Sequence, residues 1–338
     1  MNSRELVLNT LDMANPRRAP RDLWLLPWAT KRYPDELAAI RQAYPSDFVG
    51  VPGYLREQPI SKGDPYVPGI YIDDWGCEFV NIHEGVHGEV KNPRIVEDDW
   101  SDAEQVHIPR EHLTIDIDQV NAYCRAHADK FRFGGCCPRP FEQLQFLRGT
   151  ANLFMDLADP PPGMLAFINK VHAFYCELLE LWAKTEVDAL NMMDDWGSQN
   201  ALLISPDTWQ RMFKPMYQDY IDIAHRAGKR MFMHSDGHTL AIYPDLIELG
   251  LDAFNSQMFC IGVEKLAPFK GQITFWGEID RQHLLPYGSL QDIENAVALV
   301  KDTLWHNGGC IAQCEFGPSG RPENVRKVYE TWDRLTTR

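Results

Sequence analysis

The chain contains a short apolar run, Asp188-Ala189-Leu190-Asn191-Met192-Met193, that is typical of a buried strand. Ser205-Pro206 follows as a helix N-cap with a proline in the first turn, and one apolar helix face continues to Gly228. Pro215 predicts a bend within this helix. A second apolar run, at residues 230–233, comes directly after Gly228. A strand, a helix and a second strand in this order predict parallel pairing through a right-handed crossover.

The same alternation continues on both sides of this unit. Further apolar runs predict strands at residues 23–28, 47–51 and 131–136 before it, and at 252–256, 273–276 and 309–314 after it. The total of eight is the number of strands that closes a (β/α)8 barrel. No Gly/Ser-rich or Pro-rich linker divides the chain. We therefore predict one α/β TIM-barrel domain over residues 1–338, with an N-terminal helix.

One segment lacks the helical periodicity of the rest. Within residues 53–113, the stretches 71–80 and 88–93 read as paired strands with a turn between them. This predicts a β-hairpin insertion after the second strand of the barrel. Such an insertion can form a lid over the C-terminal mouth, where barrel enzymes carry their sites.

Composition and charge limit the kinds of partner that the protein can have. Hydrophobic residues make up 44% and charged residues 24%, which excludes a disordered chain. The 48 acidic and 33 basic side chains give a net charge of −15, so we expect neither nucleic acid nor a membrane surface as a partner. The first residues, MNSREL, do not form a secretion signal. We expect a cytoplasmic protein with free cysteines.

Polar side chains gather where the predicted strands end, and in a parallel barrel these ends meet at one mouth. His234 and Asp236 follow the fifth strand two residues apart, and Cys314 lies at the end of the eighth. Imidazole, carboxylate and thiolate together suit zinc, and three protein ligands leave a fourth position for substrate or water. We predict a catalytic metal site at these three residues. The alternative for His234 is a hydrogen-bonded histidine of the core.

Two further carboxylates at the strand ends are candidates for acid–base chemistry. Glu278 ends the seventh strand beside Gly277, and we predict that it is a general acid/base or a fourth metal ligand. Asp194 and Asp195 are adjacent in an extended segment, so only one of them can face the mouth. We select Asp195, which precedes Trp196-Gly197.

The segment His83-Glu84-Gly85-Val86-His87 matches the H-E-x-x-H pattern of zinc peptidases. That mechanism needs both histidines on one face of a helix, whereas Gly85 and Val86 lie between two strand-like stretches. We therefore predict a hairpin tip here. No phosphate-binding glycine loop, dinucleotide fingerprint or serine-hydrolase elbow is present.

The chain resembles the uroporphyrinogen decarboxylase superfamily, and within it the branch of zinc-dependent, corrinoid-linked methyltransferases. The resemblance extends over nearly the whole length. It is carried by DWGC at 74–77, GEVK at 88–91, DDWG at 194–197, LISP at 203–206 with FKP at 213–215, HSDG at 234–237, and GGCIAQC at 308–314 with PENV at 322–325. Such members are (β/α)8 barrels that are often dimeric, so the resemblance implies a homodimer.

The resemblance also implies a cofactor set and a reaction. Corrinoid methyltransferases of this family hold zinc on a His-x-Cys pair after strand 5 and on a cysteine after strand 8. His234 matches the histidine, Cys314 falls near the second cysteine, and Asp236 stands where the first cysteine is usual. An Asp ligand leaves zinc a stronger Lewis acid and less suited to a soft thiolate. We expect zinc to polarise a methylated oxygen or nitrogen, and the methyl group to pass to cobalamin on a separate corrinoid protein, with Glu278 or Asp195 as proton partner.

Three other functions remain open from the sequence. A porphyrinogen decarboxylase of this superfamily carries an Arg-Gln-Ala-Gly-Arg segment near its N-terminus, and the corresponding stretch here, residues 25–33, lacks it. The other two are a zinc hydrolase that uses a metal-bound hydroxide and a non-catalytic barrel that binds a ligand. Metal content and the need for cobalamin separate these functions.

Overall fold

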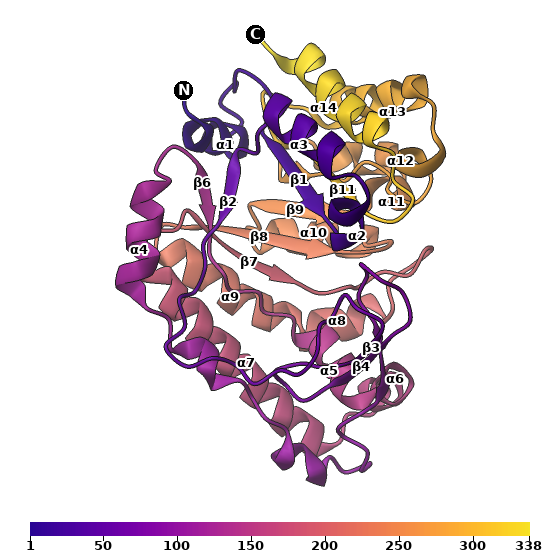
Figure 1. The fold of residues 1–338 in the computed structure, drawn as a ribbon. Helices are drawn as coiled ribbons and strands as arrows, with labels where there is room; N and C mark the ends of the chain where they lie inside the picture. The colour runs from indigo at the N-terminus through magenta and orange to yellow at the C-terminus, as the bar shows by residue number, and fades with distance from the viewer.

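Eight parallel strands form a nearly closed barrel in the computed structural model, which describes residues 1–338 (Figure 1). The strands of the barrel are β1 (Arg21–Leu25), β2 (Phe48–Gly50), β6 (Phe131–Phe133), β7 (Ala189–Met193), β8 (Arg230–Ser235), β9 (Ala253–Ser256), β10 (Thr274–Trp276) and β11 (Cys310–Phe316). Their spatial order is β1-β11-β10-β9-β8-β7-β6-β2. The predicted eight-stranded α/β barrel is confirmed.

The strand order has β1 and β2 at its two ends. A single backbone hydrogen bond joins the starts of these two strands, from the Asp47 N–H to the Arg21 carbonyl at 2.9 Å, so the barrel is not fully closed there.

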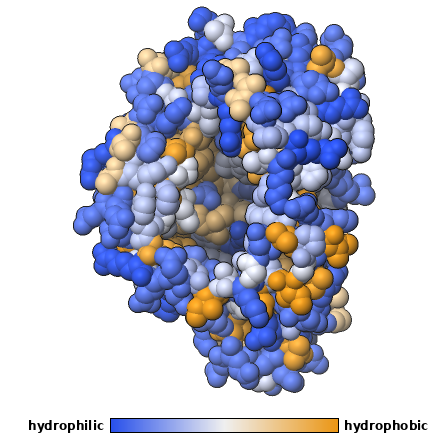
Figure 2. All heavy atoms as spheres, in the orientation of Figure 1, coloured by the Kyte–Doolittle hydropathy of each residue, from blue (hydrophilic) through white to orange (hydrophobic).

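The face of the molecule in Figure 2 is hollowed near its centre. No helix of the chain combines the length and the apolar character that a membrane span requires.

Helices follow the strands and cover the outside of the barrel. They are α1 (Ser3–Leu11), α2 (Pro27–Arg32), α3 (Pro34–Ala43), α4 (Ile117–Ala126), α5 (Pro140–Arg148), α6 (Thr150–Ala158), α7 (Pro162–Ala183), α8 (Pro206–Met212), α9 (Lys214–Arg226), α10 (Tyr243–Glu248), α11 (Met258–Ile261), α12 (Leu284–Tyr287), α13 (Leu290–Leu304) and α14 (Pro322–Thr336). The predicted bend at Pro215 is a break between α8 and α9 at Phe213. Ser205 caps α8, because its hydroxyl accepts the Thr208 N–H at 3.1 Å.

Aromatic side chains fill the inside of the barrel. Trp24, Phe131, Phe232 and Trp276 belong to one apolar cluster that is separate from the larger core between strands and helices. Val7 and other residues of α1 join the inner cluster, so this helix closes the N-terminal end of the barrel. The opposite, C-terminal end carries the polar side chains.

The insertion contains a three-stranded antiparallel sheet rather than two paired stretches. Its strands are β3 (Gly69–Ile72), β4 (Glu78–Asn81) and β5 (Glu89–Asn92). A tight turn that includes Asp73 and Gly76 divides the stretch 71–80, which the sequence pattern treated as one strand. His83 and His87 lie in the connection between β4 and β5, so the H-E-x-x-H pattern is on a hairpin and not on a helix.

Candidate active site at the barrel mouth

Two neighbouring strand ends bring Asp195, His234 and Asp236 together. Asp195 follows β7, and the other two residues lie at and just after the end of β8. His234 Nε2 is 3.7 Å from Asp195 Oδ1 and 3.5 Å from Asp236 Oδ1. One ligand atom from each of the three residues lies within 4.8 Å of the others. We refer to these three residues as the strand-end group.

Two glycines allow the loops that carry the carboxylates to approach each other. The Gly197 N–H donates to the Asp236 carbonyl at 3.1 Å, and the Asp236 N–H donates to Asp195 Oδ1 at 2.9 Å. A Cβ on Gly237 would lie 2.1 Å from the Gly197 carbonyl oxygen, and Gly237 has a φ of +79°. Any larger residue would push the loops apart. The glycines of DDWG and HSDG thus place the two carboxylates side by side.

His234 is oriented by its neighbour on β9. His234 pairs with Asn255 across the two strands, and the Asn255 amide Oδ1 lies 2.7 Å from His234 Nδ1. The Asn255 amide nitrogen donates to the Trp276 carbonyl, which leaves its oxygen toward the imidazole. Nδ1 therefore donates its proton to Asn255, and Nε2 faces the two carboxylates, where a metal ion would bind it. This is the tautomer that a metal ligand needs.

The strand-end group fits a divalent metal ion. Asp236 Oδ1 is buried and has no hydrogen-bond partner, and a coordinated cation would satisfy it. Burial raises the pKa of Asp195, mainly because few waters solvate its charge beside the carboxylate of Asp236. One imidazole and two carboxylates are a donor set that zinc accepts and that leaves coordination positions free.

Arg281 occupies the other side of the mouth and was not identified from the sequence. Its guanidinium contacts Asp236, lies 2.9 Å from Glu315 Oε1, and lies 3.5 Å from Glu278 Oε1. Glu278 is 2% exposed, its Oε2 has no hydrogen-bond partner, and burial raises its pKa well above the usual range. We call Arg281, Glu278 and Glu315 the arginine group. Glu278 thus lies at the mouth, in contact with Arg281.

Cys314 is not brought to the strand-end group. Its Sγ lies 3.6 Å from Tyr329 Oη on α14, and it belongs to the core between strands and helices. Burial raises the pKa of the Cys314 thiol to about 12. Side chains alternate along a strand, so the next residue of β11, Glu315, faces the mouth instead. The alternation of side chains along a strand is therefore the sequence signal that places Glu315, and not Cys314, at the mouth.

The adjacent carboxylates of DDWG have different surroundings. Asp194 is fully buried and accepts the backbone N–H groups of Phe141 and Glu142 at 3.2 and 2.7 Å, and the Tyr217 hydroxyl at 2.7 Å. It holds the start of α5 against β7. Asp195 points to the opposite side and lies in the strand-end group.

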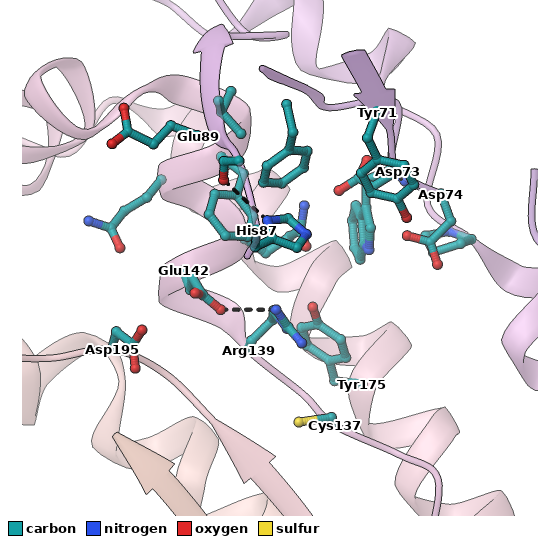
Figure 3. A pocket seen from close by; sticks show the side chains of 18 of the residues that line it. Tyr71, Asp73, Asp74, His87, Glu89, Cys137, Arg139, Glu142, Tyr175 and Asp195 are labelled. Carbon is teal, nitrogen blue, oxygen red and sulfur yellow. Dashed lines mark hydrogen bonds and ion pairs between the residues drawn. The ribbon is translucent and has the colours of Figure 1, made fainter. Parts of the chain in front are cut away.

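A cavity of 860 Å³ opens beside Asp195 and extends beneath the inserted sheet. Its other walls come from β3, β4, α5 and α7, as Figure 3 shows around Tyr71, Glu142 and Tyr175. The volume is that of a pocket for a small organic molecule. Five carboxylates and a single arginine line it, together with aromatic rings. The carboxylates are Asp73, Asp74, Glu89, Glu142 and Asp195.

Glu142 is a second residue that sequence analysis missed. It lies on α5 in the cavity wall and accepts from Arg139 Nη1 at 3.1 Å (Figure 3). Burial raises the pKa of Glu142 to about 7 in spite of the nearby arginine. A carboxyl with this pKa can give or take a proton near neutral pH. The only sign of Glu142 in the sequence is its position three residues after Arg139, a spacing that lets two side chains of a helix form an ion pair.

These observations define a class: a (β/α)8 barrel with a candidate metal centre and a substrate-sized cavity at its C-terminal mouth. The model of the uroporphyrinogen decarboxylase (URO-D) family matches residues 70–335, so the chain belongs to that family. No curated protein matches the chain.

Two solved structures are similar to this chain to different degrees. A methyltransferase from Methanosarcina mazei is 14% identical, covers 99% of each chain and has a TM-score of 0.69. An intracellular xylanase from Thermoanaerobacterium saccharolyticum is 13% identical over 88% of this chain and 85% of its own, with a TM-score of 0.39. The first likeness shows a shared fold over the whole length, and the second is too weak for any argument.

Proposed function

We propose that the protein is a zinc-dependent methyltransferase that moves a methyl group between a small O- or N-methylated substrate and a corrinoid carrier. The observation that carries this proposal is the strand-end group, which opens on the cavity at the mouth of a URO-D family barrel. The full-length likeness to a methyltransferase supports it. The corrinoid would be bound to a separate protein, and the enzyme would act as a homodimer in the cytoplasm.

Asp195, His234 and Asp236 would hold the zinc ion, and Cys314 would not. Bound zinc would act as a Lewis acid on the oxygen or nitrogen that carries the methyl group. Asn255 fixes the tautomer of His234, and Arg281 holds the second oxygen of Asp236. Contacts of this kind orient metal ligands and strengthen metal binding.

The methylated substrate would bind in the cavity beneath the inserted sheet. Its five carboxylates outnumber its one arginine, Arg139, which is already paired with Glu142, and one of them, Asp74, is paired with His112. The walls also include the rings of Tyr71, Phe146 and Tyr175. Carboxylates and aromatic rings together attract cations. A methylated amine, which is a cation when protonated, is therefore the favoured donor over a neutral methyl ether, and it would lose this proton before its nitrogen reaches the metal.

Glu142 would supply the proton that the reaction needs. When the methyl group leaves, the oxygen or nitrogen that carried it gains an electron pair and takes up a proton. Glu142 lines the same cavity as Asp195, and its pKa of about 7 lets it donate at neutral pH. Glu278 is the alternative carrier, but it lines a different pocket, together with Arg281.

The charge of the cavity argues against porphyrinogen decarboxylation. A tetrapyrrole with several carboxylates needs clustered basic groups, and Arg139 is the one arginine in the wall. A zinc hydrolase would use the same strand-end group, but it would form product from water without cobalamin.

Methyl transfer to cob(I)alamin tests the proposal. Zinc-loaded protein is given methylated amines and methyl ethers, and the formation of methylcobalamin is followed by its absorbance. We expect transfer from at least one methylated amine, at least 100-fold slower transfer in Glu142→Gln, and none in His234→Ala. If the barrel mouth holds one zinc ion per chain and no donor gives measurable methyl transfer, the proposal is contradicted. Product formed without cobalamin would identify a hydrolase.

A further inference from the structure

A second group of metal-ligating side chains lies outside the mouth, where α7 packs against α9. His172 and Cys176 are four residues apart on α7 and so share one face of the helix, and Asp219 comes from α9. One ligand atom from each lies within 4.8 Å of the others. We propose that these three residues, the helix group, bind a divalent metal ion such as zinc that joins α7 to α9. This proposal does not depend on the proposed methyl transfer.

The ligand atoms of the helix group are close enough together for one metal ion to contact all three after a local rearrangement. Cys176 Sγ lies 3.7 Å from His172 Nε2, and His172 Nε2 lies 2.9 Å from Asp219 Oδ2. Zinc with bonds of about 2.3 Å to sulfur and about 2.0 Å to nitrogen holds those two ligand atoms about 3.5 Å apart. A bound metal ion would replace the hydrogen bond between His172 and Asp219, and Cys176 Sγ, which also lies 3.8 Å from His172 Nδ1, would have to move toward Nε2.

The surroundings of His172 support a metal ligand and allow access from solvent. His172 Nδ1 lies 3.1 Å from the hydroxyl of Tyr220, which is fully buried, so one side of the ring is held in place. The side chains of His172 and Asp219 are 21% and 59% exposed, so water can reach the site and complete the coordination. Burial raises the pKa of the Cys176 thiol to about 12, but a coordinated metal removes the thiol proton.

Sulfur distinguishes the helix group from the strand-end group. The strand-end group offers only nitrogen and oxygen, and Cys314 Sγ faces α14. A cobalt(II)–thiolate charge-transfer band in the near ultraviolet can therefore come only from Cys176 if both assignments are right. The band reports binding without any measurement of activity.

The experiment adds Co²⁺ to the metal-free, full-length protein. We expect the charge-transfer band in the wild type and in His234→Ala/Asp236→Ala, which removes the mouth ligands. We expect its loss in Cys176→Ser and its retention in Cys314→Ser, the matched thiol control. Zinc should raise the Tm of His234→Ala/Asp236→Ala by several degrees and leave that of the same variant with Cys176→Ser unchanged.

Two results would overturn the proposal. The first is a wild type without the band at saturating Co²⁺, which would mean that Tyr220, His172 and Asp219 form a hydrogen-bonded chain and nothing more. The second is a band that persists in Cys176→Ser. His172→Gln provides an independent check, because it keeps the thiol but should weaken Co²⁺ binding at this site at least 10-fold.

Discussion

The two sides of the barrel mouth are both rich in carboxylates, but only one of them contains a fixed cation of its own. In the arginine group, the guanidinium of Arg281 balances the carboxylates of Glu278 and Glu315. In the strand-end group, two carboxylates face the imidazole of His234, and a buried oxygen of Asp236 has no partner. The side that lacks a cation is the side that can bind one.

The comparison shows why a count of acidic residues does not locate a metal site. Carboxylates at a strand end bind a metal only if the protein has not already neutralised them. Asp236 belongs to both sides, since Oδ2 contacts Arg281 while Oδ1 faces His234. Arg281 thus fixes the carboxylate and leaves one oxygen free for a ligand bond.

The largest effect should come from a carboxylate of the strand-end group. Asp236→Ala should weaken zinc binding at the mouth more than about 100-fold, because the loss of a ligand costs more than the roughly 10–100-fold of an outer contact. Glu315→Ala is the matched control: it also removes a partner of Arg281 but should change the affinity less than 10-fold. Titration with a competing chelator measures both. Equal losses in the two variants would mean that the sides of the mouth do not differ.

Removal of Arg281 should destabilise the fold. Arg281→Ala leaves the carboxylates of Asp236 and Glu315 without their cation, and a broken buried pair costs about 3 kcal/mol of unfolding free energy. The additional change Glu315→Gln should recover part of this loss, because it removes one of the unbalanced charges. Urea unfolding of the single and double variants measures both. A double variant no more stable than Arg281→Ala would show that Arg281 acts by packing alone.

Asp22 extends the comparison to a carboxyl group inside the barrel that has no cation. Its Oδ2 accepts the indole N–H groups of Trp24 and Trp276 at 2.9 Å, and burial raises its pKa from 3.8 to about 6. Because the folded pKa is the higher one, Asp22 favours the folded state fully below pH 3.8, and this contribution is lost as the pH rises through 6.

Asp22→Asn keeps an acceptor for both indoles but cannot ionise. Between pH 4 and pH 7, the variant should gain about 2.5 kcal/mol of unfolding free energy relative to the wild type. Urea unfolding of both proteins at the two pH values gives this difference directly. A difference that stays constant with pH would show that Asp22 is already charged at pH 4.

A smaller effect is expected from the residue that orients His234. Asn255→Leu removes the acceptor at His234 Nδ1 and should weaken zinc binding by about 10–100-fold. Asn255→Asp keeps an acceptor there and should weaken zinc binding less than Asn255→Leu does. If the two variants bind zinc equally well, the hydrogen bond does not set the tautomer of His234.

The barrel was predictable because each of its units leaves a local signal. The strand at residues 188–193, the N-cap at Ser205 and the stop at Gly228 are contiguous patterns that need no distant contact. The number of strands in the inserted sheet was harder to predict. The turn that includes Gly76 lies within a stretch that has apolar residues on both sides, so the stretch resembles one strand. Strand ends therefore located the mouth correctly, whereas the number of inserted strands was missed.

The positions of site residues were predictable at the strand ends, which place Asp195 and Glu278 at the mouth as expected. His234 and Asp236 share one strand end, so their proximity follows from spacing. Arg281 and Glu142 lie on segments that follow other strands, and no pattern in the sequence indicates which way they point. Cys314 was selected for its chemistry, although alternation along β11 turns the thiol toward α14.

The zinc content of three variants tests the central assignment most directly. Each carries Cys176→Ser, so that only the mouth can bind, and each is purified without chelator, reloaded with zinc and measured by mass spectrometry. We predict one zinc per chain in Cys176→Ser, none with the additional change His234→Ala, and one with the additional change Cys314→Ser. Zinc that survives the loss of His234, or that is lost with Cys314, would contradict the assignment of Asp195, His234 and Asp236 as the metal site.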